Sequence, residues 1–172
     1  MEYYCAMVLT GEEKSVKNAA SAAVKDLFPE ASFYTFERRL FTKKRGWFEA
    51  PLFPGYVFFN VSELTPQFFE ILKNVKGFCR ILHDNQNPTK ICGQGLEELK
   101  LFIRNGEHWG ISKVQFLPGQ KINVISGPLQ GLEGNIVAVN KKKKQITIQS
   151  SLSNDGKRFD LLYEDVQTVN IS

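Results

Sequence analysis

The sequence contains few of the residues from which catalytic and metal centres are usually built. Its 172 residues include only two histidines, His83 and His108, and three cysteines, Cys5, Cys79 and Cys92. Neither histidine belongs to a recognisable nucleophile motif, and Cys79, His83 and Cys92 do not have the spacing of a standard zinc site. An odd number of unpaired cysteines is typical of reduced thiols in a cytosolic protein. We therefore expect no enzyme, no metal site and no cofactor.

Long hydrophobic runs are also missing. No segment approaches the roughly 18 apolar residues that a transmembrane helix needs, and the start of the chain has neither a basic region nor a cleavage site. Apolar residues make up 42% and charged residues 23%, with a net charge of +4, which predicts a packed domain rather than disorder. We expect a cytoplasmic monomer that does not contact a membrane.

The first part of the chain alternates predicted strands and helices. Thr10 and Glu13 have the spacing of a capping box, and an apolar stripe from Val16 to Leu27 predicts a helix that Pro29 ends. Residue composition and stop signals predict the other elements in the same way. These are strands at residues 3–9, 32–39, 56–61 and 78–82, a helix that Thr65 caps and Gly77 ends, and a helix around residues 96–103.

The second part of the chain changes to short β segments separated by Gly, Asn and Lys turns. The apolar residues in 107–116 follow neither the period of a helix nor that of a strand, so we expect a linker there. Five short strands in about 60 residues suit a small closed barrel, because closure removes exposed sheet edges. The predicted strands are residues 121–125, 134–139, 145–149, 158–163 and 166–171.

A glycine-rich segment at residues 118–137, PGQKINVISGPLQGLEGNIV, is the most specific motif. Its glycines supply the backbone angles that tight barrel turns require. A generic small barrel would explain the glycines but not their order. In that order the segment resembles a KOW motif, which occurs in ribosomal proteins and in NusG-type transcription factors.

The N-terminal part distinguishes between these two classes. It carries, in one order, Tyr3-Tyr4, Thr10-Gly11, a basic loop, the run at residues 51–59 (PLFPGYVFF) and the run at residues 75–78 (VKGF). This pattern is similar to the N-terminal (NGN) domain of the NusG family. The resemblance implies an α+β protein: a ferredoxin-like α/β sandwich at residues 1–106, the linker at 107–116, and an SH3-like five-stranded β-barrel (KOW domain) at 117–172.

The resemblance also implies a function. In this family the NGN domain binds the clamp helices of the largest catalytic subunit of RNA polymerase and promotes processive elongation and antitermination. Aromatics beside a Pro-Gly turn can form a hot spot for a protein partner, although aromatic side chains are also common in cores. The residues of this chain that match the polymerase-facing pocket are Tyr4, Phe53, Pro54, Tyr56 and Phe78.

Two clusters of cations are candidates for contact with nucleic acid. Both would neutralise phosphates if they face one way, and both would otherwise be solvated surface. Trp47 and Phe48 favour a functional role for the first cluster, since aromatics beside cations can stack on bases. The clusters are Arg38, Arg39, Lys43, Lys44 and Arg45, and, at a predicted hairpin tip, Lys141, Lys142, Lys143 and Lys144.

The KOW part of the resemblance implies a further partner, either ribosomal protein S10 or the Rho helicase. Leu129, Leu132 and Leu152 match the apolar patch that binds them, but leucines replace the usual aromatics. This departure argues against binding of Rho. The PLFPGY run and the GPLQGLEG turn with the basic tip that follows it resemble the specialised RfaH and LoaP branches of the family, which serve selected operons through a DNA element or an RNA leader hairpin. The alternatives are a general housekeeping NusG and, from another class, a ribosome-associated KOW protein that binds rRNA.

Overall fold

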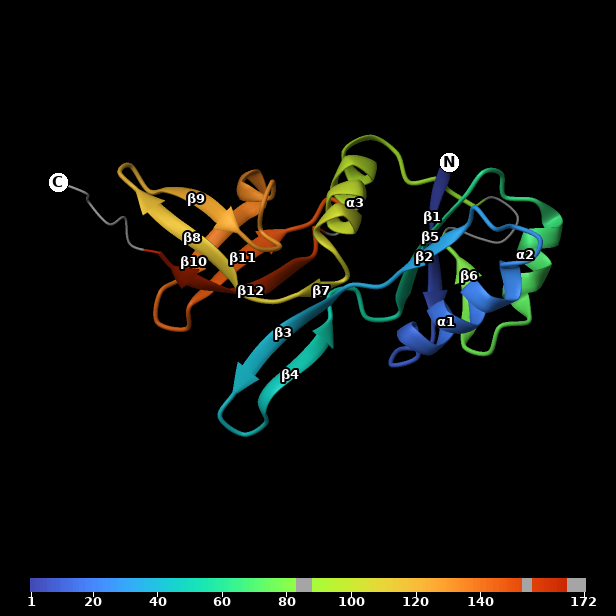
Figure 1. The fold of residues 1–172 in the computed structure, drawn as a ribbon, viewed down its shortest axis with the longest axis horizontal. Coiled ribbons are helices and arrows are strands. Elements are labelled where there is room, and N and C mark those ends of the chain that lie inside the picture. Colours follow the sequence, from blue (N-terminus) through green and yellow to red (C-terminus); the bar gives the residue numbers. More distant parts are fainter. Residues whose placement is uncertain (83–87, 153–155, 167–172) are drawn as a thin grey trace. The chain divides into compact units, whose positions relative to one another are not determined.

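The computed structural model describes residues 1–82, 88–152 and 156–166. The chain forms two compact units, each made of two separate stretches of sequence (Figure 1). Residues 1–35 and 53–96 form the first unit, and residues 36–52 and 97–172 form the second. Within the described residues, no helix combines the length and the hydrophobicity that crossing a membrane requires.

The first unit is a four-stranded antiparallel sheet with two helices. Its strands follow the spatial order β2-β5-β1-β6, and β1 pairs with both β5 and β6. With one helix after β1 and another after β5, this is the predicted ferredoxin-like arrangement. The elements are β1 (Glu2–Val8), α1 (Glu13–Val24), β2 (Ser32–Tyr34), β5 (Tyr56–Val61), α2 (Pro66–Lys73) and β6 (Phe78–Ile81).

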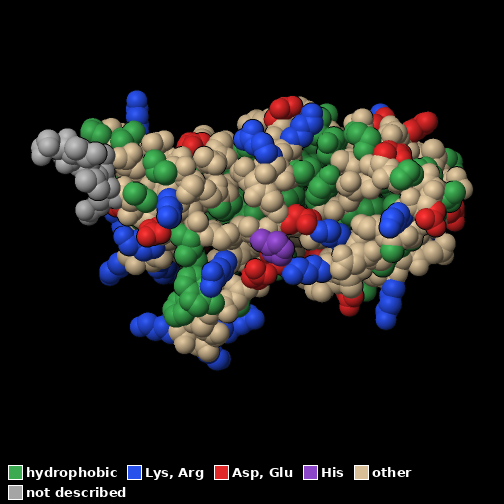
Figure 2. Space-filling model, viewed as in Figure 1, with side chains coloured by type: hydrophobic (Ala, Val, Ile, Leu, Met, Phe, Trp, Pro, Cys, Tyr) green, Lys and Arg blue, Asp and Glu red, His purple; other side chains and the backbone are tan. Residues whose placement is uncertain are grey.

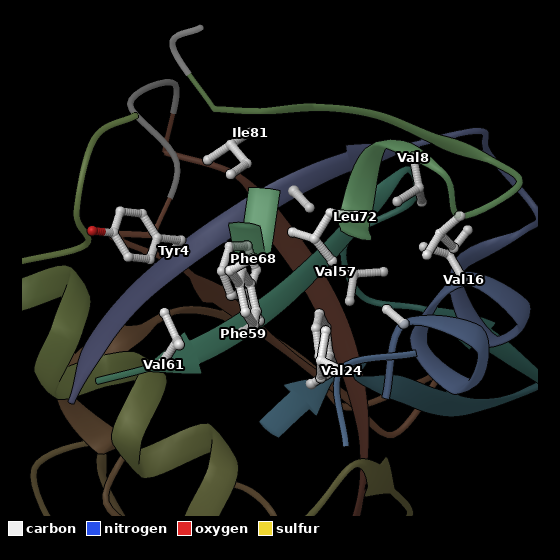
Figure 3. Packing of buried hydrophobic residues seen from close by; sticks show 14 residues of the cluster. Tyr4, Val8, Val16, Val24, Val57, Phe59, Val61, Phe68, Leu72 and Ile81 are labelled. Carbon is white, nitrogen blue, oxygen red and sulfur yellow. The ribbon is translucent and has the colours of Figure 1, made fainter. Parts of the chain in front are cut away.

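The core of the first unit lies between the sheet and the two helices (Figure 3). Alternate residues of each strand point into it, as the two-residue period of a strand requires. Phe59 is fully buried at the centre, with Tyr4 and Phe33 stacked at ring distances of 5.5 Å on either side. The helices contribute apolar stripes that include Val16 and Val24 from α1 and Phe68 and Leu72 from α2.

Local capping chemistry predicts one helix start correctly and the other incorrectly. Thr65 caps α2 as expected, because its Oγ1 accepts a hydrogen bond from the Phe68 amide at 3.2 Å. For α1 the predicted capping box is wrong: the cap residue is Glu12, which makes no side-chain capping bond. The side chain of Glu13 instead turns back and accepts hydrogen bonds from the Gly11 amide.

The second unit contains a five-stranded sheet in the order β10-β11-β12-β8-β9. A three-stranded sheet, β4-β3-β7, and the larger part of α3 belong to the same unit. Its elements are β3 (Glu37–Thr42), β4 (Gly46–Pro51), α3 (Gly93–Asn105), β7 (His108–Trp109), β8 (Ser112–Leu117), β9 (Lys121–Ser126), β10 (Ile136–Asn140), β11 (Gln145–Gln149) and β12 (Arg158–Asp165).

Three elements of the second unit differ from the sequence-based expectation. Residues 107–116, expected to form a linker, contain β7 and most of β8, and the side chains of Trp109, Ser112 and Val114 are buried. Strand β8 is therefore the fifth strand of the sheet, where we expected residues 166–171. That expected strand lies almost entirely outside the described residues.

An aromatic cluster holds the parts of the second unit together. The ring of Phe102, on α3, lies 4.5 Å from Trp109, 5.5 Å from Phe36 and 6.4 Å from Phe159 on β12. Phe102 is fully buried, and Trp109 is 1% exposed. These contacts link the base of the β3–β4 hairpin and α3 to the five-stranded sheet.

Candidate functional site

The buried carboxylate of Glu13 stabilises the turn at residues 53–56. Glu13 Oε1 accepts a hydrogen bond from the Gly55 amide at 2.6 Å, and Glu13 is only 7% exposed. Gly55 itself has a positive φ of 82°, and a Cβ there would lie 3.2 Å from Thr10 Oγ1. A side chain at this position would therefore be strained and crowded. The result is a fixed turn with Pro54 exposed at its tip.

A row of side chains crosses the sheet beside this turn, on the face opposite the helices. Tyr56 on β5 is in register with Met7 on β1, and Met7 is in register with Arg80 on β6. Arg80 Nε lies 3.2 Å from Met7 Sδ. Since Ala6 and Val8 point into the core, Met7 must point to the other face. We did not predict Met7 or Arg80, although the alternation in β1 would have identified Met7.

Three of the residues expected to face the polymerase are buried or half-buried in the first unit. Tyr4 is 2% exposed, and its hydroxyl donates a hydrogen bond to Glu2. This burial and hydrogen bond raise the pKa of Tyr4. Phe53 is 6% exposed because its ring packs edge-on against Phe58 at 5.3 Å. Phe78 is half-buried against the helix-covered core.

The β3–β4 hairpin, which contains the predicted basic loop, has two faces of different composition. Residues of β3 and β4 alternate between these faces, and pairing places Arg39 opposite Glu49 and Phe41 opposite Trp47. Phe41 and Trp47 are each 51% exposed, and their rings contact each other at 5.2 Å. The Arg39 guanidinium lies over the Trp47 ring at 4.4 Å. This face therefore presents a cation and two aromatic rings to solvent.

The tip of the hairpin carries the rest of the first basic cluster. Lys43, Lys44 and Arg45 are all exposed. The guanidinium of Arg45 lies over the Phe48 ring at 4.2 Å, on the other face of the hairpin. In Figure 2, Lys and Arg side chains gather around this tip and hydrophobic side chains lie along the stem. The structure thus brings four of the five predicted cations together with exposed aromatics.

Arg38, the fifth cation of this cluster, has a structural contact. Its Nη1 donates a hydrogen bond to the Asp160 carbonyl oxygen at 2.7 Å. Burial lowers the pKa of Arg38, and the charge of Asp160 acts in the opposite direction. Arg38 points to the face opposite Arg39, since neighbouring residues on a strand alternate. It anchors the hairpin to β12, so its side chain is not displayed for nucleic acid.

The second basic cluster occupies a hairpin tip between β10 and β11, as predicted. All four of its lysines are exposed. Lys141 lies over the Phe116 ring at 5.0 Å and Lys144 over the Tyr163 ring at 5.8 Å, which directs these two ammonium groups toward rings of β8 and β12. Lys142 and Lys143 are therefore the members best placed to meet a phosphate.

The expected apolar patch at the KOW turns is not exposed in this structure. Leu129 and Leu132 are 0% and 1% exposed, and Leu152 is half-buried. Helix α3 contacts the same turn: Asn105 Nδ2 donates hydrogen bonds to the Pro128 and Gln130 carbonyl oxygens at 2.9 and 3.0 Å. A second contact of α3 reaches the turn beside Leu152, where Glu98 Oε2 accepts hydrogen bonds from the Ser151 amide and hydroxyl.

Comparison with known proteins agrees with these features. A family model described as "Transcription termination factor nusG" matches residues 1–100. A curated relative, the transcription termination/antitermination protein NusG of Xylella fastidiosa, is 24% identical and covers 96% of this chain and 97% of its own length. A solved structure described as "Domain interaction in Thermotoga maritima NusG" has a TM-score of 0.59 at 16% identity, covering 94% of this chain and 93% of that one. Because the family model spans more than half of the sequence, the chain belongs to the NusG family of transcription termination factors.

Proposed function

We propose that this protein is an elongation and antitermination factor that binds the clamp helices of RNA polymerase and holds nucleic acid beside the polymerase. The observation that carries the proposal is the β3–β4 hairpin, which displays an exposed Phe41–Trp47 pair with a basic tip. Exposed aromatic rings can stack on unpaired bases, and the cations beside them can neutralise the phosphates of the same strand. The hairpin therefore suits single-stranded nucleic acid.

The polymerase-binding surface in this proposal is narrower than the sequence suggests. Pro54 at the fixed turn, with Tyr56 and Met7 in the row beside it, remains available on the face of the sheet that the helices do not cover. A half-buried aromatic at a rigid turn is a common hot-spot arrangement, since little conformational entropy is lost on binding. Arg80 at the end of the row would pair with an acidic residue of the clamp helices.

The first experiment tests binding to polymerase. The full chain is titrated against core RNA polymerase, with ribosomal subunits as a second target. Tyr56→Ala should weaken polymerase binding by about 2 kcal/mol, the scale of a hot spot. The matched control is Tyr34→Ala, an aromatic of β2 in the same sheet, which should leave affinity unchanged. Equal affinity of wild type and the Tyr56 variant, or retention on ribosomal subunits alone, would contradict the proposal.

The second experiment tests the hairpin with single-stranded DNA and duplex DNA of equal length. Trp47→Ala should weaken single-strand binding by about 1–3 kcal/mol, the contribution of one stacked base. Replacing Lys43, Lys44 and Arg45 with Gln should reduce the salt slope by roughly 0.7 for each single-strand phosphate that is no longer neutralised. An unchanged slope would exclude phosphate binding at the tip, and an unchanged affinity of Trp47→Ala would exclude stacking.

A specialised role at selected operons is part of the same proposal. The burial of Leu129 and Leu132 supports it, since these leucines are not displayed to ribosomal protein S10 or Rho in this structure. Lys142 and Lys143 would then contact an RNA leader hairpin. Titrating leader RNA, scrambled RNA and S10 against one preparation tests this role: tight S10 binding without leader preference would indicate the housekeeping factor.

A further inference from the structure

Three side chains with metal-ligating atoms lie together at the base of the β3–β4 hairpin. They are Glu37 on β3, Glu49 on β4 and His108 on β7. His108 Nδ1 lies 3.6 Å from Glu37 Oε2 and 3.8 Å from Glu49 Oε1. One ligand atom from each residue lies within 4.8 Å of those of the other two. The proposed function uses none of these three residues.

Backbone pairing alone brings these residues onto one face. Strand β7 runs parallel to β3 and places His108 in register with Glu37. Strand β4 runs antiparallel and places Pro51 opposite Glu37, so Glu49 is the diagonal neighbour on the same face. Trp109, the next residue on β7, is buried on the other side and so directs His108 outward. In Figure 2 a histidine side chain lies beside acidic side chains.

The chemistry of this set suits a divalent transition metal. Zinc binds imidazole nitrogen and carboxylate oxygen at about 2.0–2.2 Å, which places tetrahedral ligand atoms about 3.3 Å apart. The two observed separations from His108 Nδ1 exceed this value by only a few tenths of an ångström. The Glu49 side chain is 50% exposed and can rotate to close the difference.

The three residues are accessible enough for water to bind an ion at the same site. The His108 side chain is 65% exposed, so water can complete the coordination of an ion held by the three residues. Magnesium and calcium prefer sites made of oxygen alone, and an imidazole nitrogen disfavours them. Arg39 lies on the same face of the hairpin, in register with Glu49, and its guanidinium lies over the Trp47 ring at 4.4 Å.

We propose that Glu37, Glu49 and His108 bind one divalent ion of the zinc class, which ties both strands of the hairpin to β7. The hairpin would then be cross-linked at its base, while its aromatic face and basic tip stay free. The competing arrangement is direct contact between the His108 ring and the two carboxylates without an ion, in which case the wild type would bind no zinc.

Isothermal titration of the chelator-treated full chain with Zn²⁺, and separately with Mg²⁺, tests the proposal. The wild type should bind one Zn²⁺ per chain and no Mg²⁺. His108→Gln and Glu49→Gln should each lower zinc affinity by at least about tenfold, since removing even a supporting residue of a metal site costs that much. The matched control is His83→Gln, which removes the only other histidine and should leave affinity unchanged.

Each other outcome counts against the site. Absence of zinc binding by the folded wild type would overturn it, as would an affinity that His83→Gln abolishes and His108→Gln preserves. Tryptophan fluorescence shows whether each variant is folded, because Trp109 is buried next to His108 and the chain has only one other tryptophan. The test requires neither polymerase nor nucleic acid, so it is independent of the proposed function.

Discussion

Replacing Glu13 should release the turn that carries Pro54 and Tyr56. Glu13 accepts a hydrogen bond from the buried Gly55 amide at 2.6 Å and weaker ones from the exposed Gly11 amide at 3.1 Å. A hydrogen bond to a charged group contributes about 1.5–3 kcal/mol when its partner would otherwise be buried without one. The Gly11 amide can turn to water, so the Gly55 bond accounts for most of the loss. We expect Glu13→Ala to cost about 2–3 kcal/mol.

Hydrogen exchange at the Gly55 amide measures this loss locally. A loss of about 2 kcal/mol corresponds to roughly 30-fold faster exchange, because the exchange rate is proportional to the equilibrium constant for opening when the turn recloses quickly. Glu12→Gln is the matched control: Glu12 is exposed, and its side chain accepts a hydrogen bond from the Ser15 hydroxyl at 2.7 Å. Polymerase affinity should fall for Glu13→Ala and not for the control. Unchanged protection of Gly55 in Glu13→Ala would refute the assignment of this carboxylate as the support of the turn.

Three further predictions concern other parts of the molecule. Phe102→Ala should destabilise the second unit by about 3–5 kcal/mol, since it removes a fully buried ring; chemical denaturation followed by tryptophan fluorescence measures this. Gly127→Ala should lower the melting temperature, because its Cβ would lie 2.7 Å from the Ser112 backbone at a φ of 100°. Alkylation of the native protein should label two thiols and leave Cys5 unmodified until unfolding, because burial raises its pKa while Cys79 and Cys92 are exposed.

Several features that depend on neighbouring residues were predicted correctly from the sequence, although the capping box of α1 was not. Thr65 and Pro66 specify the start of α2 through one hydrogen bond and one fixed backbone angle, and both act within a single turn. The KOW-type turn and the lysine hairpin tip were found for the same reason, since glycine and turn residues act locally. Order along the chain then identified the family.

Features that depend on distant packing were not predicted. The sequence does not tell whether the side chains of Leu129 and Leu132 are buried or exposed. Helix α3, which forms hydrogen bonds with their turn, lies about 25 residues earlier in the chain. Arg38 and Arg39 are adjacent in sequence, yet one bonds Asp160 and the other stacks on Trp47. The group of Glu37, Glu49 and His108 shows no motif spacing, because pairing of β3 with β7 joins residues about 70 positions apart.

The discontinuity of the second unit has a consequence for biosynthesis. The hairpin at residues 36–52 leaves the ribosome early, but its packing partners on α3, β7 and β12 are made later. Asp160, which accepts the Arg38 hydrogen bond, follows the hairpin by roughly 100 residues, or about 5–20 s at typical bacterial elongation rates. The first unit has all of its residues by position 96 and can fold during this interval. The β3–β4 hairpin is therefore synthesised well before β12, the strand to which the Arg38 side chain anchors it.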